Sequence, residues 1–252
     1  MLARVLQLIR RNANRPLGRN ADHPLSTSGV DKPVEQLYKQ KTYLEAYSEH
    51  TNIRVELDPH LAVGGMWEEM GKLQLDFLVN QGLRPTHKFL DIGCGTLRGG
   101  RHFIRYLEAE NYAGMDISFK AIEHGKSLVR EEGLSDKQPK LLISWNRDLK
   151  FKEFSGETFD YLLAQSVFTH LMPEHIEECF QHIGTIMGTG SRFFFTFYEA
   201  SAVMQVGLKD FMYPFSFFES LAEKYRFKLA DCSVEYSHPR GQKMARLSKL
   251  AA

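Results

Sequence analysis

The chain has 252 residues, of which 43% are hydrophobic, and a formal net charge of +1. These values allow one sizeable core and argue against an overall basic surface for nucleic acid. No apolar run approaches the ~18 residues of a membrane-spanning helix, and the three scattered cysteines do not suggest a disulfide framework. We therefore expect a cytoplasmic protein with one folded domain.

The N-terminal segment is basic and amphipathic. Its first twenty residues contain five arginines and no acidic residue, and Leu2, Val5, Leu6 and Ile9 recur at helical spacing. Three interpretations remain open: peripheral contact with an anionic membrane surface, an organellar transit peptide, or a helix that packs on the protein. Prolines and glycines between residues 13 and 35 favour a linker. Residues 1–35 are therefore assigned to a basic tail and linker.

Two helices are expected before the first strand. The pattern is helical from about Pro33 to Tyr47, and Asp58 followed by proline breaks it. After a glycine pair at residues 64–65, apolar residues recur at helical spacing from Trp67, and this helix ends near Gly82. Trp67 is either a lid residue or part of the core, and the glycine pair is a candidate hinge.

A glycine-rich turn follows a short apolar strand in residues 87–100, HKFLDIGCGTLRGG. Phe89, Leu90 and Ile92 are typical of a strand buried in a parallel sheet. Gly93 and the second glycine of the turn allow a sharp bend and a close approach to a ligand. A helix is predicted from about Gly99, so its first amides would point into the same space.

Three further strands follow in order. Residues 111–116 form a strand that ends in Asp116, 25 residues after Asp91. Residues 140–144 form the third strand, with the sequence WNRD directly after it, and residues 159–164 form the fourth. Because the carboxyl ends of parallel strands meet at one edge of the sheet, the residues that follow these strands should lie together.

The C-terminal part supplies the last strands. Residues 192–198 are a central strand after a turn at residues 188–190, and residues 199–214 form a long apolar connection before a helix near Phe217. That connection is either a substrate cap or a surface that packs on the domain or another subunit. Residues 228–236 and 242–250 read as an antiparallel hairpin whose turn contains His238 and Arg240.

One helix has a spacing compatible with metal binding. His175, Cys179 and His182 stand at i, i+4 and i+7 after Pro173. Cys179, however, falls in the apolar stripe of that helix, and no fourth ligand is evident. We therefore predict no metal site.

The motifs stand in an order found in one enzyme family. The sequence LDIGCG at residues 90–95, the acid Asp116 after the second strand and the Phe-Asp start of the fourth strand resemble the class I S-adenosylmethionine-dependent methyltransferases. The resemblance covers residues 60–250. It implies an α/β fold with a seven-stranded, mostly parallel sheet of order 3-2-1-4-5-7-6, the last strand antiparallel, sandwiched by helices. Residues 36–86 would then cap the cofactor or substrate, and residues 87–252 would form the core.

The resemblance also implies the cofactor site. Asp91 contacts the methionine end of the cofactor, directly or through water, and the glycines let the chain pass under it. A carboxylate at the position of Asp116 can accept both ribose hydroxyls, the alternative being a helix cap. Asn146 is preferred to Asp148 for the adenine amine, with a simple turn as the alternative. The expected cofactor-binding residues are Asp91, Gly93, Cys94, Gly95, Asp116, Ile117, Asn146, Gln165 and Ser166.

The expected catalytic residues are His170, Gln165 and His238. Gln165 should lie beside the sulfonium or the acceptor atom, and His170 is the preferred general base because imidazole titrates near neutrality. Each histidine has a purely structural role as its alternative. Arg98 departs from the small or apolar residues usual in this turn; it either pairs with the methionine carboxylate or an acidic substrate, or stays solvated.

We therefore expect a methyltransferase that uses S-adenosylmethionine, yields S-adenosylhomocysteine and acts on an oxygen of a small molecule or sugar. The alternative is a non-catalytic S-adenosylmethionine-binding sensor or scaffold. A nicotinamide-dependent oxidoreductase is disfavoured, because Arg98 occupies the place of the third glycine in the dinucleotide fingerprint. Nucleic acid is not an expected partner, since no Asn-Pro-Pro-Tyr or Asp-Pro-Pro-Tyr sequence follows the fourth strand.

Overall fold

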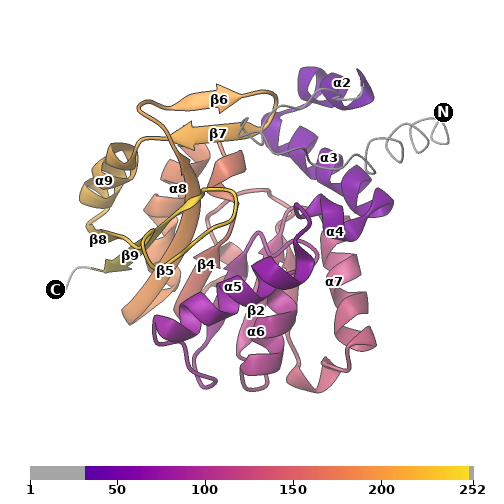
Figure 1. Cartoon of the computed structure of the whole chain (residues 1–252), viewed down its shortest axis with the longest axis vertical. Coiled ribbons are helices and arrows are strands. Elements are labelled where there is room, and N and C mark those ends of the chain that lie inside the picture. The colour runs from indigo at the N-terminus through magenta and orange to yellow at the C-terminus, as the bar shows by residue number, and fades with distance from the viewer. Residues whose placement is uncertain (1–31, 250–252) are drawn as a thin grey trace.

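The computed structural model describes residues 32–249, which form a sheet with helices on both faces (Figure 1). The expectations for residues 1–31 of the N-terminal tail and linker lie outside the described residues. The strands are β1 Phe89–Ile92, β2 Tyr112–Asp116, β3 Lys140–Ile143, β4 Phe159–Ala164, β5 Met187–Glu199, β6 Met204–Val206, β7 Asp210–Tyr213, β8 Phe227–Asp231 and β9 Lys243–Lys249.

The helices precede or connect these strands. The α-helices are α2 Lys32–Gln40, α3 Tyr43–Leu57, α4 Pro59–Ala62, α5 Trp67–Asn80, α6 Gly100–Tyr106, α7 Phe119–Glu131, α8 Pro173–Ile183 and α9 Phe215–Lys224. Short 3-10 turns are η1 Ser135–Lys137, η2 Lys152–Phe154, η3 Phe168–His170 and η4 Gly184–Ile186. Among residues 32–249, no helix is both long and apolar enough to cross a bilayer.

The main sheet has the order β3-β2-β1-β4-β5-β9-β8. Neighbours from β3 to β5 pair in parallel, β9 is antiparallel to β5, and β8 is antiparallel to β9. The expected sixth and seventh strands are β8 and β9, so the predicted order and the reversed last strand are confirmed. The short β6–β7 hairpin is an addition, and β7 pairs with the end of β5.

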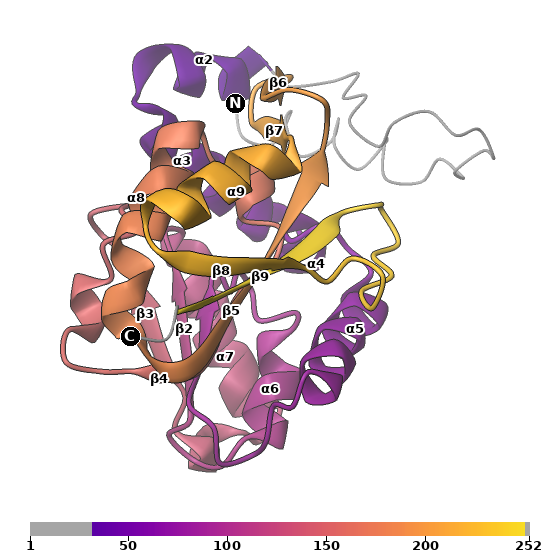
Figure 2. The ribbon, with the colours of Figure 1, turned by 90° about the vertical axis from the view of Figure 1, so that its left-hand side faces the viewer.

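Helices α8 and α9 lie on one side of the sheet and α5 and α6 on the other (Figure 2), and two apolar clusters hold the helices there. One cluster packs α8 and α9 against one face and is rich in phenylalanine, with Phe168, Phe180 and Phe218 fully buried. The other packs α5, α6 and α7 on the opposite face, around Phe77 and Phe103. The helices therefore bury both faces of the central strands, as their continuous apolar sequences predict.

Local chemistry changes several predicted boundaries. The helix expected from residue 33 to residue 47 is two helices, α2 and α3. The break follows Gln40, because the Glu45 carboxylate accepts hydrogen bonds from the backbone N–H and hydroxyl of Thr42, at 3.1 and 2.7 Å, and so starts a new helix. Helix α2 begins at Lys32, inside the expected linker, and Pro59 opens the short α4 after Asp58.

Two further expectations near β5 were wrong. The turn predicted at residues 188–190 is an irregular beginning of β5, where the register with β4 shifts after Phe159. The connection predicted at residues 199–214 contains the β6–β7 hairpin. Helix α9 follows as expected, and the loop from residue 232 to residue 242 joins β8 to β9.

Candidate active site

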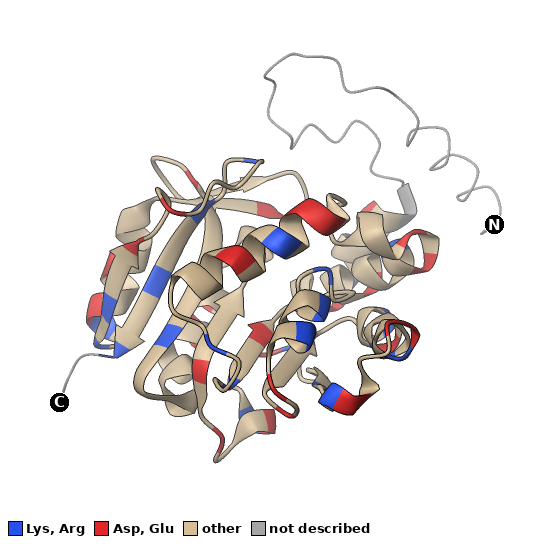
Figure 3. Ribbon diagram, turned by 60° about the horizontal axis from the view of Figure 1, so that its bottom comes forward, with Lys and Arg blue, Asp and Glu red and all other residues tan. Residues whose placement is uncertain are grey.

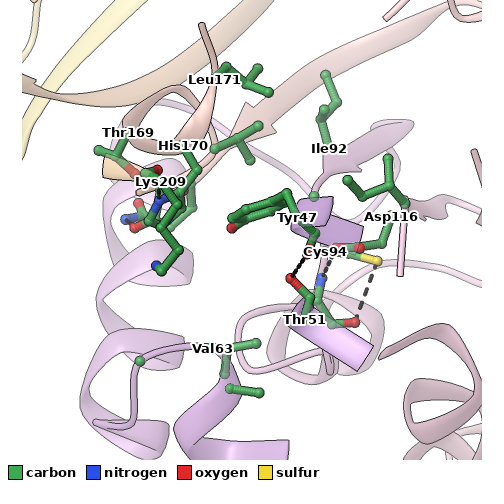
Figure 4. A pocket seen from close by; sticks show the side chains of 18 of the residues that line it. Tyr47, Thr51, Val63, Ile92, Cys94, Asp116, Thr169, His170, Leu171 and Lys209 are labelled. Carbon is green, nitrogen blue, oxygen red and sulfur yellow. Dashed lines mark hydrogen bonds between the residues drawn. The ribbon is translucent and has the colours of Figure 1, made fainter. Parts of the chain in front are cut away.

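A cavity of about 810 Å³ lies at the carboxyl ends of β1, β2 and β4. The residues on these strand ends, the strand wall, include Asp91, Gly93, Cys94, Gly95, Asp116, Ile117, Gln165 and Ser166. Opposite them lies the helix wall. It consists of Tyr47, His50 and Arg54 of α3 together with Lys209, which precedes β7, and Asp210, the first residue of β7. In Figure 4, Tyr47 lies between Asp116 and Cys94 on one side and His170 and Lys209 on the other.

The glycine turn brings the backbone close to the cavity. Gly93 and Gly95 have φ of +69° and +56°, in the left-handed region that favours glycine. A Cβ at Gly93 would lie 2.5 Å from Val167, and one at Gly95 would lie 2.6 Å from Val63. The Gly95 N–H donates to Asp116 Oδ2 at 2.9 Å. The turn therefore joins the ends of β1 and β2 and leaves room only for glycine.

The two predicted carboxylates both reach the cavity. Asp91 is 4% exposed, and Tyr112 donates its hydroxyl to Asp91 Oδ2 at 2.9 Å. Burial, with a smaller effect from Asp116, raises the pKa of Asp91 to about 7, although the Tyr112 hydrogen bond opposes the shift. A buried carboxylate with a raised pKa is stabilised by a cation beside it. Burial also raises the pKa of Asp116.

Helix α3 is anchored to the end of β2. Ser48 donates to the Ile117 carbonyl at 2.8 Å, and Ser118 donates to Asn52 Oδ1 at 2.7 Å. Ser118 itself caps α7, because its hydroxyl accepts from the Ala121 N–H. Asp116 is therefore not the cap of that helix, and its carboxylate stays on the cavity wall.

The region after β3 differs from the prediction. Asn146 is exposed and does not line the cavity, whereas Arg147, Asp148 and Leu149 do. Arg147 has φ of +53°, which redirects the chain and brings the following residue to the cavity. Trp145 is 66% exposed and lies near Phe119, with 6.4 Å between ring centroids. Asp148 therefore lines the cavity, whereas Asn146, the residue preferred from the sequence for the adenine amine, does not.

Polar side chains after β4 form a buried network. Tyr236 donates to Gln165 Oε1 at 2.6 Å, and Gln165 Nε2 donates to Gln242 Oε1 at 3.2 Å. Ser166 also donates to Gln242 Oε1, at 3.0 Å, while its N–H donates to Thr196. The network fixes the Gln165 amide at the cavity, where the sequence placed it.

His170 has the geometry of an oriented imidazole. Its Nδ1 lies 3.0 Å from Asp210 Oδ1 and 3.0 Å from the Lys209 carbonyl. Both partners only accept hydrogen bonds, so Nδ1 carries the proton and Nε2 is left as the basic nitrogen. Burial, together with the Lys209 ammonium, lowers the pKa of His170, and Asp210 opposes the shift. The ring is therefore neutral near pH 7, and Nε2 is its unprotonated nitrogen.

His238 also lines the cavity, but its surroundings are cationic. Its Nδ1 accepts from the Arg240 N–H at 3.1 Å. Burial, then Arg98 and Arg240, lowers its pKa to about 4. Its imidazole is therefore a weaker base than an unperturbed histidine. Between the two predicted bases, only His170 has a carboxylate partner.

Trp67, a candidate lid, is not among the residues that line the cavity. It is half-buried and stacks on His60 at 4.0 Å, with the Arg101 guanidinium 5.4 Å above its ring. Cys179 of α8 is fully buried in the core, which agrees with its place in the apolar stripe.

The sequence reasoning missed the helix wall. Tyr43, Tyr47, His50 and Arg54 recur at i, i+4, i+7 and i+11 of α3, so they share one helical face. The signal in the sequence that could have revealed this wall is the aromatic and basic character of that helical face, where a helix that packs on the core would carry apolar residues. Lys209 and Asp210 follow a turn whose position only the β6–β7 hairpin fixes.

Comparisons with known proteins bear on the domain and its fold. Residues 90–193 match a family model described as a methyltransferase domain. The magnesium protoporphyrin IX methyltransferase of Synechocystis PCC 6803, solved with S-adenosylmethionine, is 15% identical, with 83% of this chain and 98% of that chain covered and a TM-score of 0.63. A Haemonchus contortus phosphoethanolamine N-methyltransferase, solved with S-adenosylhomocysteine, is 14% identical, with 84% and 61% covered and a TM-score of 0.62.

The cyclase SpnF has the same fold, with 16% identity, 84% and 98% coverage and a TM-score of 0.62. The fold is that of the class I S-adenosylmethionine-dependent methyltransferases, and the methyltransferase-domain model matches the part of the chain from β1 into β5. The Synechocystis enzyme is solved with S-adenosylmethionine and, in a second structure, with S-adenosylhomocysteine. Three features of the chain fit that cofactor: the glycine turn, the buried Asp91, and the buried Arg98 Nε, which has no partner among the described residues.

Proposed function

We propose that this methyltransferase methylates an oxygen of a small molecule or sugar, and that His170 is its general base. The observation that carries the proposal is the 3.0 Å contact between His170 Nδ1 and Asp210 Oδ1 at the cavity. When bound, S-adenosylmethionine supplies an electrophilic methyl carbon. A hydroxyl must lose its proton as it attacks, and His170 Nε2 would take that proton, whereas a neutral amine needs only alignment.

Asp210 acts as a positioning residue in this proposal. Its carboxylate holds the Nδ1–H tautomer of His170 and stabilises the imidazolium that forms. Tyr43 supports the same segment, since its hydroxyl donates to the His170 carbonyl at 2.7 Å and the Lys209 carbonyl at 3.2 Å. Tyr213 donates to the Leu171 carbonyl. Hydrogen bonds from α3 and from β7 therefore hold the segment that carries His170.

We assign the cofactor contacts along the strand wall. Asp91 receives the cationic methionine end, and Gly93, Cys94 and Gly95 lie beneath it. Asp116, with Ile117 beside it, accepts the ribose hydroxyls, since each of its oxygens keeps a lone pair after accepting a backbone N–H. Asp148 takes the adenine role proposed earlier for Asn146.

Gln165 and Ser166 complete the site on the acceptor side of the cofactor. Their mutual hydrogen bond of 3.0 Å and the Tyr236 contact keep the Gln165 amide in place. The transferable methyl group would face these residues, and an acceptor oxygen must stand in line within about 3–3.5 Å of the methyl carbon. His238 is retained as the second candidate base.

A non-catalytic binding protein is the competing function. The test incubates the chain with S-adenosylmethionine carrying an isotopic methyl label and matched acceptors that differ only in hydroxyl, amine or thiol. We expect label on the hydroxyl acceptor and an equal yield of S-adenosylhomocysteine. Label on the amine alone contradicts oxygen methylation, and binding without any transfer supports the sensor or scaffold.

A further inference from the structure

The helix wall brings two cations to the cavity. Arg54 Nη2 donates to the Leu61 carbonyl at 3.0 Å, and within residues 32–249 the structure gives this guanidinium no salt bridge. Lys209 Nζ lies 3.6 Å from Asp210 Oδ1, its one carboxylate partner in the described chain. Both cations line the cavity rather than the outer surface of the domain.

Asp210 does not neutralise this pair. The same oxygen that faces Lys209 also accepts the His170 Nδ1–H. His50, whose Nδ1 lies 3.2 Å from the Tyr38 hydroxyl, contributes no negative charge, and burial, Lys209 and Arg54 lower its pKa to about 3. Asp210 is therefore shared between Lys209 and His170, and no carboxylate pairs with Arg54 in the described residues. A partly buried positive charge without a partner is unfavourable, and an anionic ligand would relieve it.

We propose that the helix wall binds an anionic group, a carboxylate or a phosphate, on the methyl acceptor. This inference rests on the proposed function and names the substrate class of the same site. Lys209 and His170 lie on the same side of Tyr47 (Figure 4), so an acceptor held by its anionic group would also present a hydroxyl to the base. Leu44, Tyr47 and Leu171 give the body of the acceptor an apolar and aromatic surface.

The carboxylate of the cofactor is a different anion with a different partner. The strand wall offers it Arg98, which is 8% exposed and whose Nη1 donates to the Val63 and Gly65 carbonyls at 2.6 and 2.9 Å. Its Nε is buried and unpaired in the described residues. The positive charges of the helix wall therefore remain for the acceptor.

The test measures binding of small probes to the full chain loaded with S-adenosylhomocysteine, so that the cofactor carboxylate is already in place. The probes are 4-hydroxybenzoate, 4-hydroxyphenyl phosphate and the neutral 4-hydroxybenzamide, compared by calorimetry. We expect at least one anionic probe to bind about tenfold more tightly than the amide, and the stronger of the two identifies carboxylate or phosphate as the preferred group.

Variants locate the site. Lys209→Gln and Arg54→Gln should each remove most of the anion preference without changing the affinity for S-adenosylhomocysteine. The matched controls are Lys39→Gln and Arg130→Gln, which change exposed residues that do not line the cavity and should bind all probes as the unmodified chain does. Circular dichroism and the cofactor affinity confirm that each variant is folded.

Three outcomes overturn the anion site: no preference for either anionic probe, a preference that survives both cavity variants, or a loss of S-adenosylhomocysteine affinity in those variants. The last would assign these cations to the cofactor. A chain that binds the anionic probes but methylates no hydroxyl contradicts the proposed oxygen chemistry and leaves the anion site in place. Equal methylation of neutral and anionic hydroxyl acceptors contradicts the anion site and leaves the proposed oxygen chemistry in place.

Discussion

The two walls of the cavity differ in the charged residues that they carry and in the elements that hold those residues. The strand wall places two buried carboxylates, Asp91 and Asp116, on a turn fixed by glycine and by short backbone hydrogen bonds. The helix wall places two cations and one carboxylate on side chains from α3 and the β6–β7 turn. We infer that the first wall recognises the positively charged methyl donor and the second recognises the acceptor.

The walls also differ in their surroundings. Over the outer surface, basic and acidic residues are interspersed along the helices and strands (Figure 3), in keeping with the net charge of +1. Inside the cavity, Asp91 and Asp116 lie on the strand wall, and Arg54 and Lys209 lie on the helix wall. Because these residues lie on different walls, we expect substitutions to disrupt recognition of the donor and of the acceptor independently. Three predictions test this independence.

The largest expected effect is on the rate and concerns His170. His170→Gln should lower kcat by roughly 100-fold or more, because the acceptor hydroxyl loses its base, and should leave the affinity for S-adenosylhomocysteine within about twofold. His182→Gln, which lies on α8 outside the cavity, is the matched control. Steady-state kinetics and calorimetry measure both quantities. A normal rate in the His170 variant would remove it as the base.

The next effect concerns the strand wall alone. Asp116→Ala should weaken binding of S-adenosylhomocysteine by about 1 to 3 kcal/mol, because the ribose hydroxyls lose their acceptors in a buried place. Asp136→Ala, in the exposed η1 turn, should not change the affinity. The affinity of the acceptor probes in the loaded protein should also be unchanged. If calorimetry finds the same cofactor affinity in the Asp116 variant, the ribose assignment is wrong.

The smallest effect is a dependence of cofactor binding on pH. In the free protein the pKa of Asp91 is raised to about 7, and the ammonium group of a bound ligand favours the ionised form. Binding therefore releases a proton below pH 7, so the affinity for S-adenosylhomocysteine should fall by up to about tenfold per pH unit below that value and level off above it. Calorimetry between pH 5 and 8 measures the slope, and Asp91→Asn should flatten it. A flat profile in the unmodified chain contradicts this role of Asp91.

The sequence predicted the strand wall because its elements are local. The motif at residues 90–95 joins a strand to a turn within a few residues, and Asp116 ends the next strand along the chain. Parallel pairing of β1 with β2 then brings both acids to one edge. The sequence did not show that Asp148, and not Asn146, lines the cavity, since the left-handed residue Arg147 redirects the chain between them.

The helix wall could not be predicted in the same way. His170 was selected for its imidazole, but its partner Asp210 is 40 residues away in the chain and reaches it only because β7 pairs with the end of β5. The break between α2 and α3 also decides which face of α3 meets the cavity, and it depends on the Thr42–Glu45 contact.

By itself, the sequence determined the main strands and the positions of Asp91 and Asp116 at two strand ends, because periodicity and short motifs encode contacts between near neighbours in the chain. The order of the strands followed from the resemblance to a known family. Only the tertiary structure decided the tautomer of His170, the placement of Asp148 and the cationic face of α3. These features depend on side chains from distant segments that meet across the cavity, and no local pattern specifies such a meeting.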